Sequence, residues 1–414
     1  MTGTGHPAEP PNAAPSDGAW PGRALSGGVL YQLQVRTFTP DGTLAAAADR
    51  LDHLVQLGVD LVELLPIETP HGLTAFVDAC HARGLGVILH VGYEHLDPRS
   101  DHAQQAVLAS VGRWLREHHL DGLRVQLSGA LADPAATRLL AQLAAEVTVL
   151  SLQLGRPLSL IAGSEVDDGR LVVPAASATH DHGDPAGCGD FASLESLAAV
   201  LVRRFAADPL AHDAGAIGSA HDRITATLSP SLRRVGATLL LTGPAIPIVW
   251  MGEEWSSTAR PAAPGHRPAP EPAMASAGRG VNAPTRAWWD AATGDAPADG
   301  DPAPLDWSEL GAPPHRGMLE LYRRLIALRR QEPQLTAACG KSTDVRQGDH
   351  FLTVRRGSCV VVANLGRTPR RVNVAGVPRR VLLATEPGVS LTHDAVDLPA
   401  ECAAVVVGRR FDRH

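Results

Sequence analysis

The 414-residue chain contains a single lysine, Lys341, among its 37 basic residues, and its 44 acidic residues give a net charge of −7. The remaining basic residues are arginines that are scattered along the chain and do not gather into one stripe. Proteins that bind nucleic acid usually carry such a stripe, because contacts to phosphate supply most of their affinity. We therefore expect no nucleic-acid partner.

Long apolar runs are also missing. The most apolar stretch, residues 235–251, is interrupted by Gly243, Pro244 and Pro247 before it reaches the roughly 20 residues that a membrane span requires. Residues 1–28 have neither the basic start nor the apolar segment of a signal peptide, and their content of Gly, Pro, Ala and Ser is typical of a disordered tail. The sequence predicts a cytoplasmic protein that makes no membrane contact.

Cysteine is scarce, and its pattern excludes two classes of small scaffold. The five cysteines are odd in number and widely spaced, with no C-x-x-C pair: Cys80, Cys188, Cys339, Cys359 and Cys402. This spacing argues against a disulfide framework and against a zinc cluster. We expect buried free thiols.

From Val29 onward, short β-rich runs alternate with longer segments of helical periodicity, which is typical of parallel strands in βα units. We predict seven strands, one short of eight, at residues 29–35, 59–65, 86–91, 122–127, 158–163, 215–219 and 245–251. The predicted helices cover residues 43–57, 73–83, 102–119, 134–154 and 194–205.

The second half of the chain changes character twice. Residues 256–304 contain nine prolines in 49 residues and predict a long loop or linker. A strong helix follows at 317–330, and the remaining residues contain only short β-rich runs, which favours a small antiparallel sandwich. The predicted organisation is a tail at 1–28, an α/β barrel at 29–335 and a C-terminal sandwich at 336–414.

Several short motifs occur in a characteristic order. They are Tyr31-Gln-Leu-Gln-Val35 with Thr37-Phe-Thr-Pro40, Leu51-Asp-His-Leu54, Phe76-Val-Asp-Ala-Cys-His-Ala-Arg-Gly84, Asp121-Gly-Leu-Arg124, Met251-Gly-Glu-Glu-Trp255 and Leu305-Asp-Trp-Ser-Glu-Leu310. Through these motifs the chain resembles glycoside hydrolase family 13, and within it the malto-oligosyltrehalose trehalohydrolases. The resemblance covers about residues 30–410, with gaps. It implies a TIM-type (β/α)₈ barrel, a C-terminal β-sandwich and action on α-1,4-linked glucans in trehalose metabolism. In place of the amino-terminal sandwich that is usual in those enzymes, we expect only the tail at residues 1–28.

The resemblance also places the reacting groups, at the C-terminal ends of the strands. Its nucleophilic aspartate falls on Gln126, and its acid/base glutamate falls on Gly163. A retaining glycosidase needs two carboxyl groups about 5–5.5 Å apart, and loss of a nucleophile costs on the order of 10⁶ in rate in a comparable covalent enzyme. We therefore expect a degenerate member of the family without the catalytic carboxylate pair.

Five further positions match the family's sugar-binding residues. Tyr93, His95 and Arg124 are retained, and the His-Asp pair that holds the reacting sugar is best matched by His221 and Asp222. We assign substrate binding to Tyr93, His95, Arg124 and His221, and retain Asp222 as a catalytic candidate. Arg124 without its usual partner is expected to pair with Asp222 or with another acid of the barrel rim.

The loops that wall the glucan cleft in this family are nearly absent. Leu65 leads through Pro66 and Pro70 almost directly into the next helix, and only about eight residues separate His95 from the following helix. Short connections of this kind are normal for a bare barrel. We also expect no sixth strand in residues 172–189, with residues 170–173 as the only substitute, so an unclosed barrel is one alternative.

Other interpretations stay open at this point. Glu165 lies two residues beyond Gly163 and is a candidate displaced acid, which together with Asp222 would give a weak α-1,4-glucosidic hydrolase. A non-catalytic module that binds a malto-oligosaccharide, another α-glucan or an unknown protein partner is the other alternative.

Two histidine groups and a pair of glutamates suggest further sites. His90 with Glu94 and His95, and His180 with Asp181 and His182, match no zinc motif well, and we expect no metal and no cofactor. Glu253 and Glu254 follow an apolar strand, but the resemblance implies that their segment supports the barrel rim.

Overall fold

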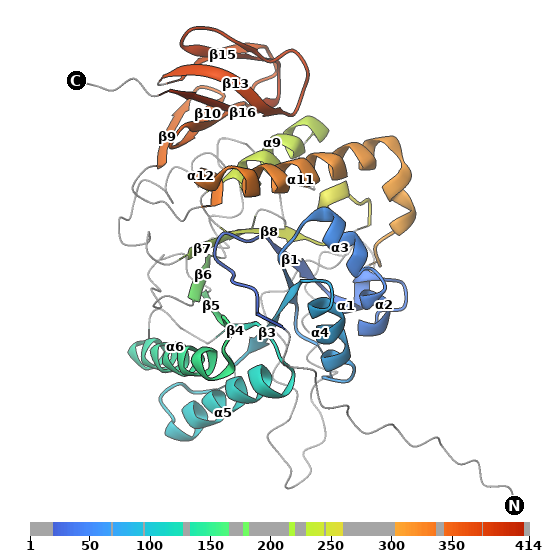
Figure 1. Cartoon of the computed structure of the whole chain (residues 1–414), viewed down its shortest axis with the longest axis vertical. Coiled ribbons are helices and arrows are strands. Elements are labelled where there is room, and N and C mark those ends of the chain that lie inside the picture. The colour runs from blue at the N-terminus through green and yellow to red at the C-terminus, as the bar shows by residue number, and fades with distance from the viewer. Residues whose placement is uncertain are drawn as a thin grey trace, which may run out of the picture.

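The computed structural model describes residues 20–67, 69–93, 96–126, 133–164, 177–181, 215–219, 229–243, 246–259, 303–336, 343–374 and 376–409. These residues form a closed barrel of eight parallel strands with helices around it, and a C-terminal unit of two antiparallel sheets (Figure 1). The predicted α/β barrel followed by a β-sandwich is confirmed. The predicted helix at 194–205, the bulk of the 256–304 segment and the first 19 residues lie outside the described residues.

The barrel strands follow the chain in order, each pairing with the next, and the last pairs with the first. They are β1 (Leu30–Leu33), β2 (Leu61–Leu64), β3 (Gly86–Gly92), β4 (Gly122–Gln126), β5 (Ser159–Ser164), β6 (Ser177–Asp181), β7 (Gly215–Ser219) and β8 (Ile246–Trp250). Seven of these coincide with predicted strands.

The expectation of a missing sixth strand was wrong. Residues 177–181 form β6, which pairs in parallel with β5 through Gly163 and His180 and with β7 through Thr179 and Ala216. The segment Ser-Ala-Thr-His-Asp has no apolar alternation to predict a strand, and the two neighbouring strands supply the pairing that makes it one. The barrel therefore closes and has no open edge at this point.

Helices cover the outside of the barrel. They are α1 (Val35–Phe38), α2 (Leu44–Ala48), α3 (Leu51–Leu57), α4 (Leu73–His81), α5 (Asp101–Glu117), α6 (Pro134–Leu154), α9 (Pro230–Thr242), α11 (Pro313–Gln331) and α12 (Pro333–Thr336), with the 3₁₀ turns η2 (Glu253–Trp255) and η3 (Trp307–Gly311). The predicted helix 43–57 is two helices, because the backbone at Asp49 and Arg50 leaves the regular helical path.

Helix starts follow their capping chemistry. Ser100, Asp133 and Ser229 each accept a backbone N–H in the first turn of α5, α6 and α9, and a proline opens both α6 and α9. Helix α6 is long and apolar enough to cross a bilayer by length and composition. It lies against the barrel beside α5 (Figure 1), with Leu139, Leu143 and the other residues of its inner face buried.

The barrel interior is built in layers. Its lower layer is apolar and combines side chains from five strands with Leu25 of the preceding segment: Leu25, Leu30, Leu61, Ile88, Ile161, Ile246 and Ile248. Two residues further along β1 to β4, the inward positions become polar, because side chains two apart on a strand share one face. These polar residues are Gln32, Glu63, His90 and Arg124, all at least nine-tenths buried.

Residues 20–28, which we expected to belong to a disordered tail, are packed across the N-terminal edge of the barrel. Trp20 stacks on His81 with ring centroids 4.3 Å apart, and its Nε1 donates to Asp121 at 2.7 Å. Arg23 forms an ion pair with Asp60. The sequence of this segment has no periodicity, so the hydrogen bond from Trp20 to Asp121, 101 positions away, could not be predicted from it.

The C-terminal unit is a sandwich of a five-stranded and a three-stranded sheet, in the orders β13-β16-β11-β10-β9 and β12-β15-β14. Its strands are β9 (Thr343–Gly348), β10 (Phe351–Arg356), β11 (Cys359–Asn364), β12 (Arg370–Asn373), β13 (Val377–Ala384), β14 (Ser390–Leu391), β15 (Ala395–Leu398) and β16 (Cys402–Arg409). A valine-rich core that includes Val360, Val396 and Val406 fills the space between the sheets.

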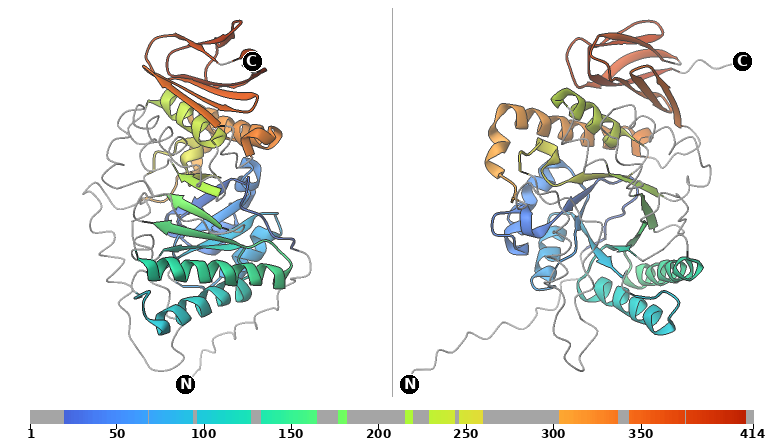
Figure 2. Two further views of the ribbon diagram at one scale, coloured as in Figure 1. Left: turned by 90° about the vertical axis from the view of Figure 1, so that its left-hand side faces the viewer. Right: turned by 180° about the vertical axis from the view of Figure 1, so that it is seen from behind.

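Helices α9 and α11 lie between the barrel and the sandwich (Figure 2). The face of the five-stranded sheet that is turned away from the three-stranded sheet, including Leu352 and Val361, belongs to the same apolar cluster as the barrel helices. Arg356 of β10 donates to the carbonyl oxygens of Thr242 and Gly243 at the end of α9, at 3.2 and 2.9 Å. A basic group at this end of a helix complements its dipole, so the sandwich is joined to the barrel by both packing and charge.

Candidate active site at the barrel mouth

The two positions at which the resemblance places catalytic carboxylates are neighbours in the barrel. Gln126 is the last residue of β4, and its Cα pairs in register with that of Gly163 on β5. On the other side, Gln126 is in register with Gly92 of β3. Both predicted positions therefore lie at the C-terminal ends of adjacent strands, where barrel chemistry takes place. At these positions an amide residue stands beside a residue that has no side chain.

Arg124, two residues before Gln126, is completely buried and holds a carboxylate that the sequence analysis did not single out. Its Nη2 donates to Oε2 of Glu63 at 2.6 Å, and its Nε donates to the other oxygen of the same carboxylate. The paired groups come from β2 and β4, so the ion pair crosses the barrel interior beneath the mouth. Arg124 is thus paired with an acid, but the expectation of a rim acid was wrong, because its partner Glu63 is fully buried on β2 beneath the mouth.

A two-pronged ion pair of this kind satisfies the Glu63 carboxylate and neutralises the buried guanidinium charge. The positive charge of Arg124 is therefore neutralised by Glu63, although position 126 carries an uncharged glutamine. The sequence signal for Glu63 was a lone acid within the apolar strand Leu-Val-Glu-Leu, on the same face as Leu61. An inward-facing acid in a barrel strand needs a partner, and the inward-facing arginine of β4, Arg124, supplies it.

Tyr93, predicted to contact substrate, is fully buried directly after β3. Its hydroxyl donates to Oγ of Ser110 on α5 at 3.0 Å, and its ring belongs to the main apolar cluster. The structure thus gives Tyr93 a role in joining β3 to α5. Its contact with substrate stays a prediction.

The remaining predicted site residues, His95, Glu165, His221 and Asp222, lie outside the described residues. The structure does not place them relative to Gln126 or Gly163. The same holds for Glu94 and His182 of the two histidine groups. Within the described ranges, no set of three His, Cys, Asp or Glu side chains is arranged to hold a metal ion.

The rim between β8 and β1 is occupied by structural contacts. Glu254 is fully buried and accepts from the hydroxyl of Tyr31 at 3.0 Å, while His53 of α3 lies 2.9 Å from the same oxygen. Burial, followed by the negative charge of Glu254, raises the pKa of Tyr31 well above its usual value, so this hydroxyl remains a donor. Glu254 thereby ties β1, α3 and η2 together.

Glu253 has a similar role on the other side of the turn. It accepts from the hydroxyl of Tyr322 on α11 and from the backbone N–H of Trp250. Gly252, which precedes it, has φ of 83°, and a Cβ there would lie 2.6 Å from Leu305. Both glutamates are therefore used in the rim, as the resemblance implied for this segment.

The connections that follow β2 and β3 are short in the structure too. Residues 65–72 separate β2 from α4, and residues 93–100 separate β3 from α5. Neither connection contains a helix or strand of its own among its described residues. The described part of the mouth therefore has no long wall on this side of the barrel.

Comparison with known proteins identifies the family of the chain. It is 33% identical to a malto-oligosyltrehalose trehalohydrolase of Rhizobium sp. (strain M-11) over 493 residues, which cover 94% of this chain and 82% of the relative. A trehalohydrolase of Mycobacterium tuberculosis is 30% identical, with 96% and 86% of the two chains covered. The chain belongs to the malto-oligosyltrehalose trehalohydrolases of glycoside hydrolase family 13. A family model described as a domain of unknown function, DUF3459, matches residues 345–407, which lie in the sandwich.

Solved structures agree on the fold. A candidate α-amylase from Salmonella typhimurium superposes with a TM-score of 0.70 at 20% identity, covering 97% of this chain and 85% of the other. A pullulanase from Anoxybacillus sp. LM18-11, solved with maltotetraose, gives a TM-score of 0.65 at 14% identity and coverages of 93% and 72%. The trehalohydrolase-like chain therefore has the barrel-and-sandwich fold of the α-amylase group.

The alignment with the Rhizobium trehalohydrolase also measures how much shorter this chain is. It spans 493 residues, whereas 94% of the 414 residues of this chain is about 389, so roughly 100 aligned positions of the relative face a gap. Internal segments of the relatives thus have no counterpart here.

Proposed function

We propose that this chain is a degenerate trehalohydrolase-like protein that binds a malto-oligosaccharide or another α-glucan and does not hydrolyse it by the two-carboxylate mechanism. The observation that carries the proposal is the pairing of Gln126 with Gly163 at the ends of β4 and β5. A neutral amide forms no glycosyl ester, and a glycine has no group with which to protonate the leaving oxygen. Neither position supplies the carboxyl group that its half of the reaction requires.

The ion pair beneath these positions supports the same proposal. Arg124 has its charge satisfied by Glu63, so the barrel keeps a stable polar interior without an aspartate at position 126. The proposed loss of the nucleophile therefore leaves no buried charge without a partner. The fold remains intact while the chemistry is absent.

Glucan binding is supported by the relatives and structural neighbours. The curated relatives are named for action on malto-oligosyltrehalose, and pullulanases of the same fold were solved with maltotetraose and with maltose. The short connections after β2 and β3 leave fewer residues to contact a long chain. We therefore propose a short malto-oligosaccharide as the ligand.

Cellular location is part of the proposal. Within the described part of the chain, Cys80, Cys359 and Cys402 are free and buried, as expected for a protein of a reducing compartment. Burial raises the pKa of Cys80 most strongly, which keeps this thiol protonated and unreactive. We propose a cytoplasmic protein of α-glucan and trehalose metabolism.

Titration calorimetry with maltotetraose tests the binding half of the proposal. We expect saturable heat with the wild-type chain, and a Gln126→Ala variant that binds about 3- to 10-fold more weakly, the range that one hydrogen bond supplies. Arg371→Gln, which removes an exposed ion pair with Asp397 on the sandwich, is the matched control and leaves binding unchanged. A folded wild-type chain that gives no heat with maltose, maltotetraose or malto-oligosyltrehalose contradicts glucan binding and favours a module that binds a protein partner.

Product analysis tests the other half. If Glu165 and Asp222 form a displaced pair, trehalose appears during incubation with malto-oligosyltrehalose and disappears in a Glu165→Ala variant. Under the proposed function neither protein releases trehalose. The variant also identifies contaminating host hydrolase, whose activity is unaffected by the substitution.

A further inference from the structure

The turn between β15 and β16 of the sandwich contains a residue with a strained backbone. Glu401 has φ of 46°, in the left-handed region that costs a non-glycine residue free energy. Such strain persists only where the surroundings impose the conformation, and it suggests that the residue has a specific structural role. The contacts of Glu401 indicate what this role is.

The turn is fixed from within the sandwich. The backbone N–H of Glu401 donates to the carbonyl oxygen of Gly366 at 2.9 Å. The side chain of the buried Asn364 donates to the carbonyl oxygen of Pro399 at 2.7 Å, and its own oxygen accepts from Gly366 at 3.0 Å. These three bonds hold the turn in one shape and thereby impose the left-handed conformation on Glu401.

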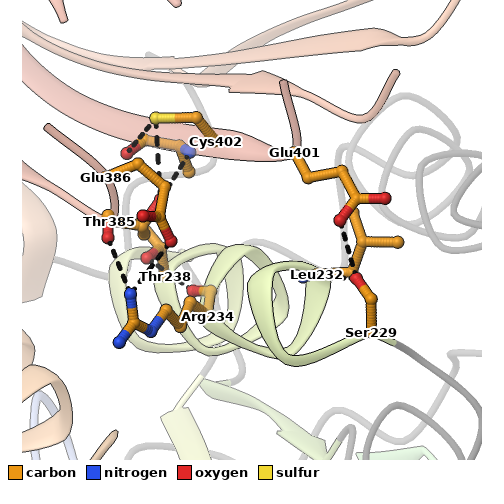
Figure 3. A network of polar contacts seen from close by, with 9 residues as sticks. Ser229, Leu232, Arg234, Thr238, Thr385, Glu386, Glu401 and Cys402 are labelled. Atoms are coloured by element: carbon orange, nitrogen blue, oxygen red, sulfur yellow. Dashed lines mark hydrogen bonds and ion pairs between the residues drawn. The ribbon is translucent and has the colours of Figure 1, made fainter. Parts of the chain in front are cut away.

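In that conformation the side chain of Glu401 leaves the sandwich and reaches the start of α9 (Figure 3). Its Oε2 accepts a hydrogen bond from the hydroxyl of Ser229 at 2.8 Å. Ser229 is the N-cap of α9, and its hydroxyl oxygen accepts from the backbone N–H of Leu232 at 3.2 Å. The hydroxyl is thus oriented by Glu401 to act as a cap, and the carboxylate lies near the positive end of the helix dipole.

The cap of α9 is also the end of a connection that starts at the barrel mouth. β7 ends at Ser219, and Ser229 is where the described chain resumes before α9. In a barrel, such a connection starts at the C-terminal end of its strand, on the side where ligands bind. A residue that fixes Ser229 therefore fixes one end of the seventh βα connection.

We propose that Glu401 is a positioning residue through which the sandwich sets the N-terminal cap of α9 and, with it, the end of the seventh βα connection. A second contact, from Arg234 to Glu386 at 2.9 Å, joins the sandwich to the body of the same helix (Figure 3). The two contacts have different roles: Arg234 attaches the body of α9 to the sandwich, and Glu401 orders the first turn of α9. Any effect of this coupling on glucan binding rests on the proposed function.

Hydrogen exchange of the full chain, followed by mass spectrometry, tests the proposal with Glu401→Asn. Asparagine tolerates the left-handed conformation but is one methylene shorter, so the turn is kept while the contact with Ser229 is lost. We expect amides of residues 230–233 to exchange roughly tenfold faster, the range expected for loss of a cap. Exchange of residues 239–242, at the other end of the helix, is expected to change much less than exchange of residues 230–233.

Two further variants complete the design. Ser229→Ala is expected to accelerate the same amides, and the Glu401→Asn/Ser229→Ala double variant to be no faster than Ser229→Ala alone, because both act through one hydroxyl. Arg234→Gln is the matched control on the same helix and is expected to lower the denaturant midpoint without a selective effect on the first turn. Additive effects of Glu401→Asn and Ser229→Ala, or unchanged exchange at 230–233, overturn the proposal.

A binding arm separates this proposal from the proposed function. With the same variants, we expect the Kd for maltotetraose to rise about threefold in Glu401→Asn and not in Arg371→Gln. If the wild-type chain binds no glucan, the proposed function fails while the exchange experiment still decides the role of Glu401. If exchange changes selectively but the Kd does not, the coupling to ligand is overturned.

Discussion

The two ends of strand β4 differ in what they retain. At its N-terminal edge, Asp121 is fully buried and its carboxylate accepts from four groups: Trp20 Nε1, His81 Nε2, the Val87 N–H and Arg156 Nη1. At its C-terminal end, Gln126 stands beside Gly163, where the resemblance places two carboxylates. In barrels the first end carries stability and the second carries chemistry. This chain keeps the first set of groups and, by our proposal, lacks the second.

The largest effect is expected at the N-terminal edge. Asp121→Ala removes the acceptor shared by all four donors and leaves Arg156 buried without its partner, which costs about 3–5 kcal/mol of unfolding free energy. Urea denaturation measures this change. Asp52→Asn, which breaks an exposed ion pair with Arg83, is the control and is expected to cost less than about 1 kcal/mol. Equal costs for the two variants would contradict the stabilising role of Asp121 at this edge.

The second prediction concerns the ion pair that lies below the mouth. Glu63→Gln leaves the guanidinium of Arg124 buried and uncompensated, with an expected cost of about 3 kcal/mol. A Glu63→Gln/Arg124→Met double variant is expected to recover most of this loss, since no buried charge remains. If the double variant is as unstable in urea as Glu63→Gln alone, an uncompensated charge on Arg124 is not the cause of the instability.

The segment at residues 20–28 gives a smaller effect. Trp20→Ala removes one hydrogen bond to Asp121 and the stacking on His81, together worth about 1–3 kcal/mol. Trp20→Phe keeps a ring and is expected to recover part of the loss. The thermal midpoint measures both. If Trp20→Ala leaves the thermal midpoint unchanged, residues 20–28 do not stabilise the N-terminal edge of the barrel.

The smallest effect depends on pH at the β8–β1 rim. Burial opposes ionisation of Glu309, but hydrogen bonds from Thr258, Ser257 and Trp255 outweigh it and lower the pKa of this carboxyl. Because its folded pKa is depressed, the stabilisation is present above the unfolded value of about 4.3 and is lost as pH falls through the folded pKa.

Tryptophan fluorescence of the folded chain between pH 6 and 3 measures this loss, because Trp255 Nε1 donates to Glu309 at 3.1 Å. We expect an acid-induced change in the wild type that is absent from Glu309→Gln. Identical titrations for the two proteins would mean that the rim does not respond through Glu309.

The strands of the barrel could be predicted wherever their own residues are apolar. β3 and β8 are buried along their whole length and consist mainly of apolar residues, with His90 as the polar exception in β3, so they were found from sequence. β6 has no such signal, because its strand geometry comes from pairing with β5 and β7. The packed segment at 20–28 was missed for a related reason, since Trp20 meets Asp121 only in the folded barrel.

The candidate site divides in the same way. Gln126 and Gly163 were located by motif, and their pairing in register follows from adjacent parallel strands. Glu63 was missed, because a single acid in an apolar strand reveals its role only when its partner on β4 is known to face it. Glu401 has no sequence signal at all, because its strained backbone and its contact with Ser229 arise from tertiary packing.

The rate of trehalose release from malto-oligosyltrehalose by the purified wild-type chain tests the central claim most directly. The assay is run beside Glu165→Ala and beside an active trehalohydrolase. We predict no release by either form of this chain, at a detection limit about 10⁶-fold below the active enzyme, the loss expected when a catalytic nucleophile is absent. Release by the wild type that disappears with Glu165→Ala would contradict the account, because the mouth of the barrel would then have retained its chemistry.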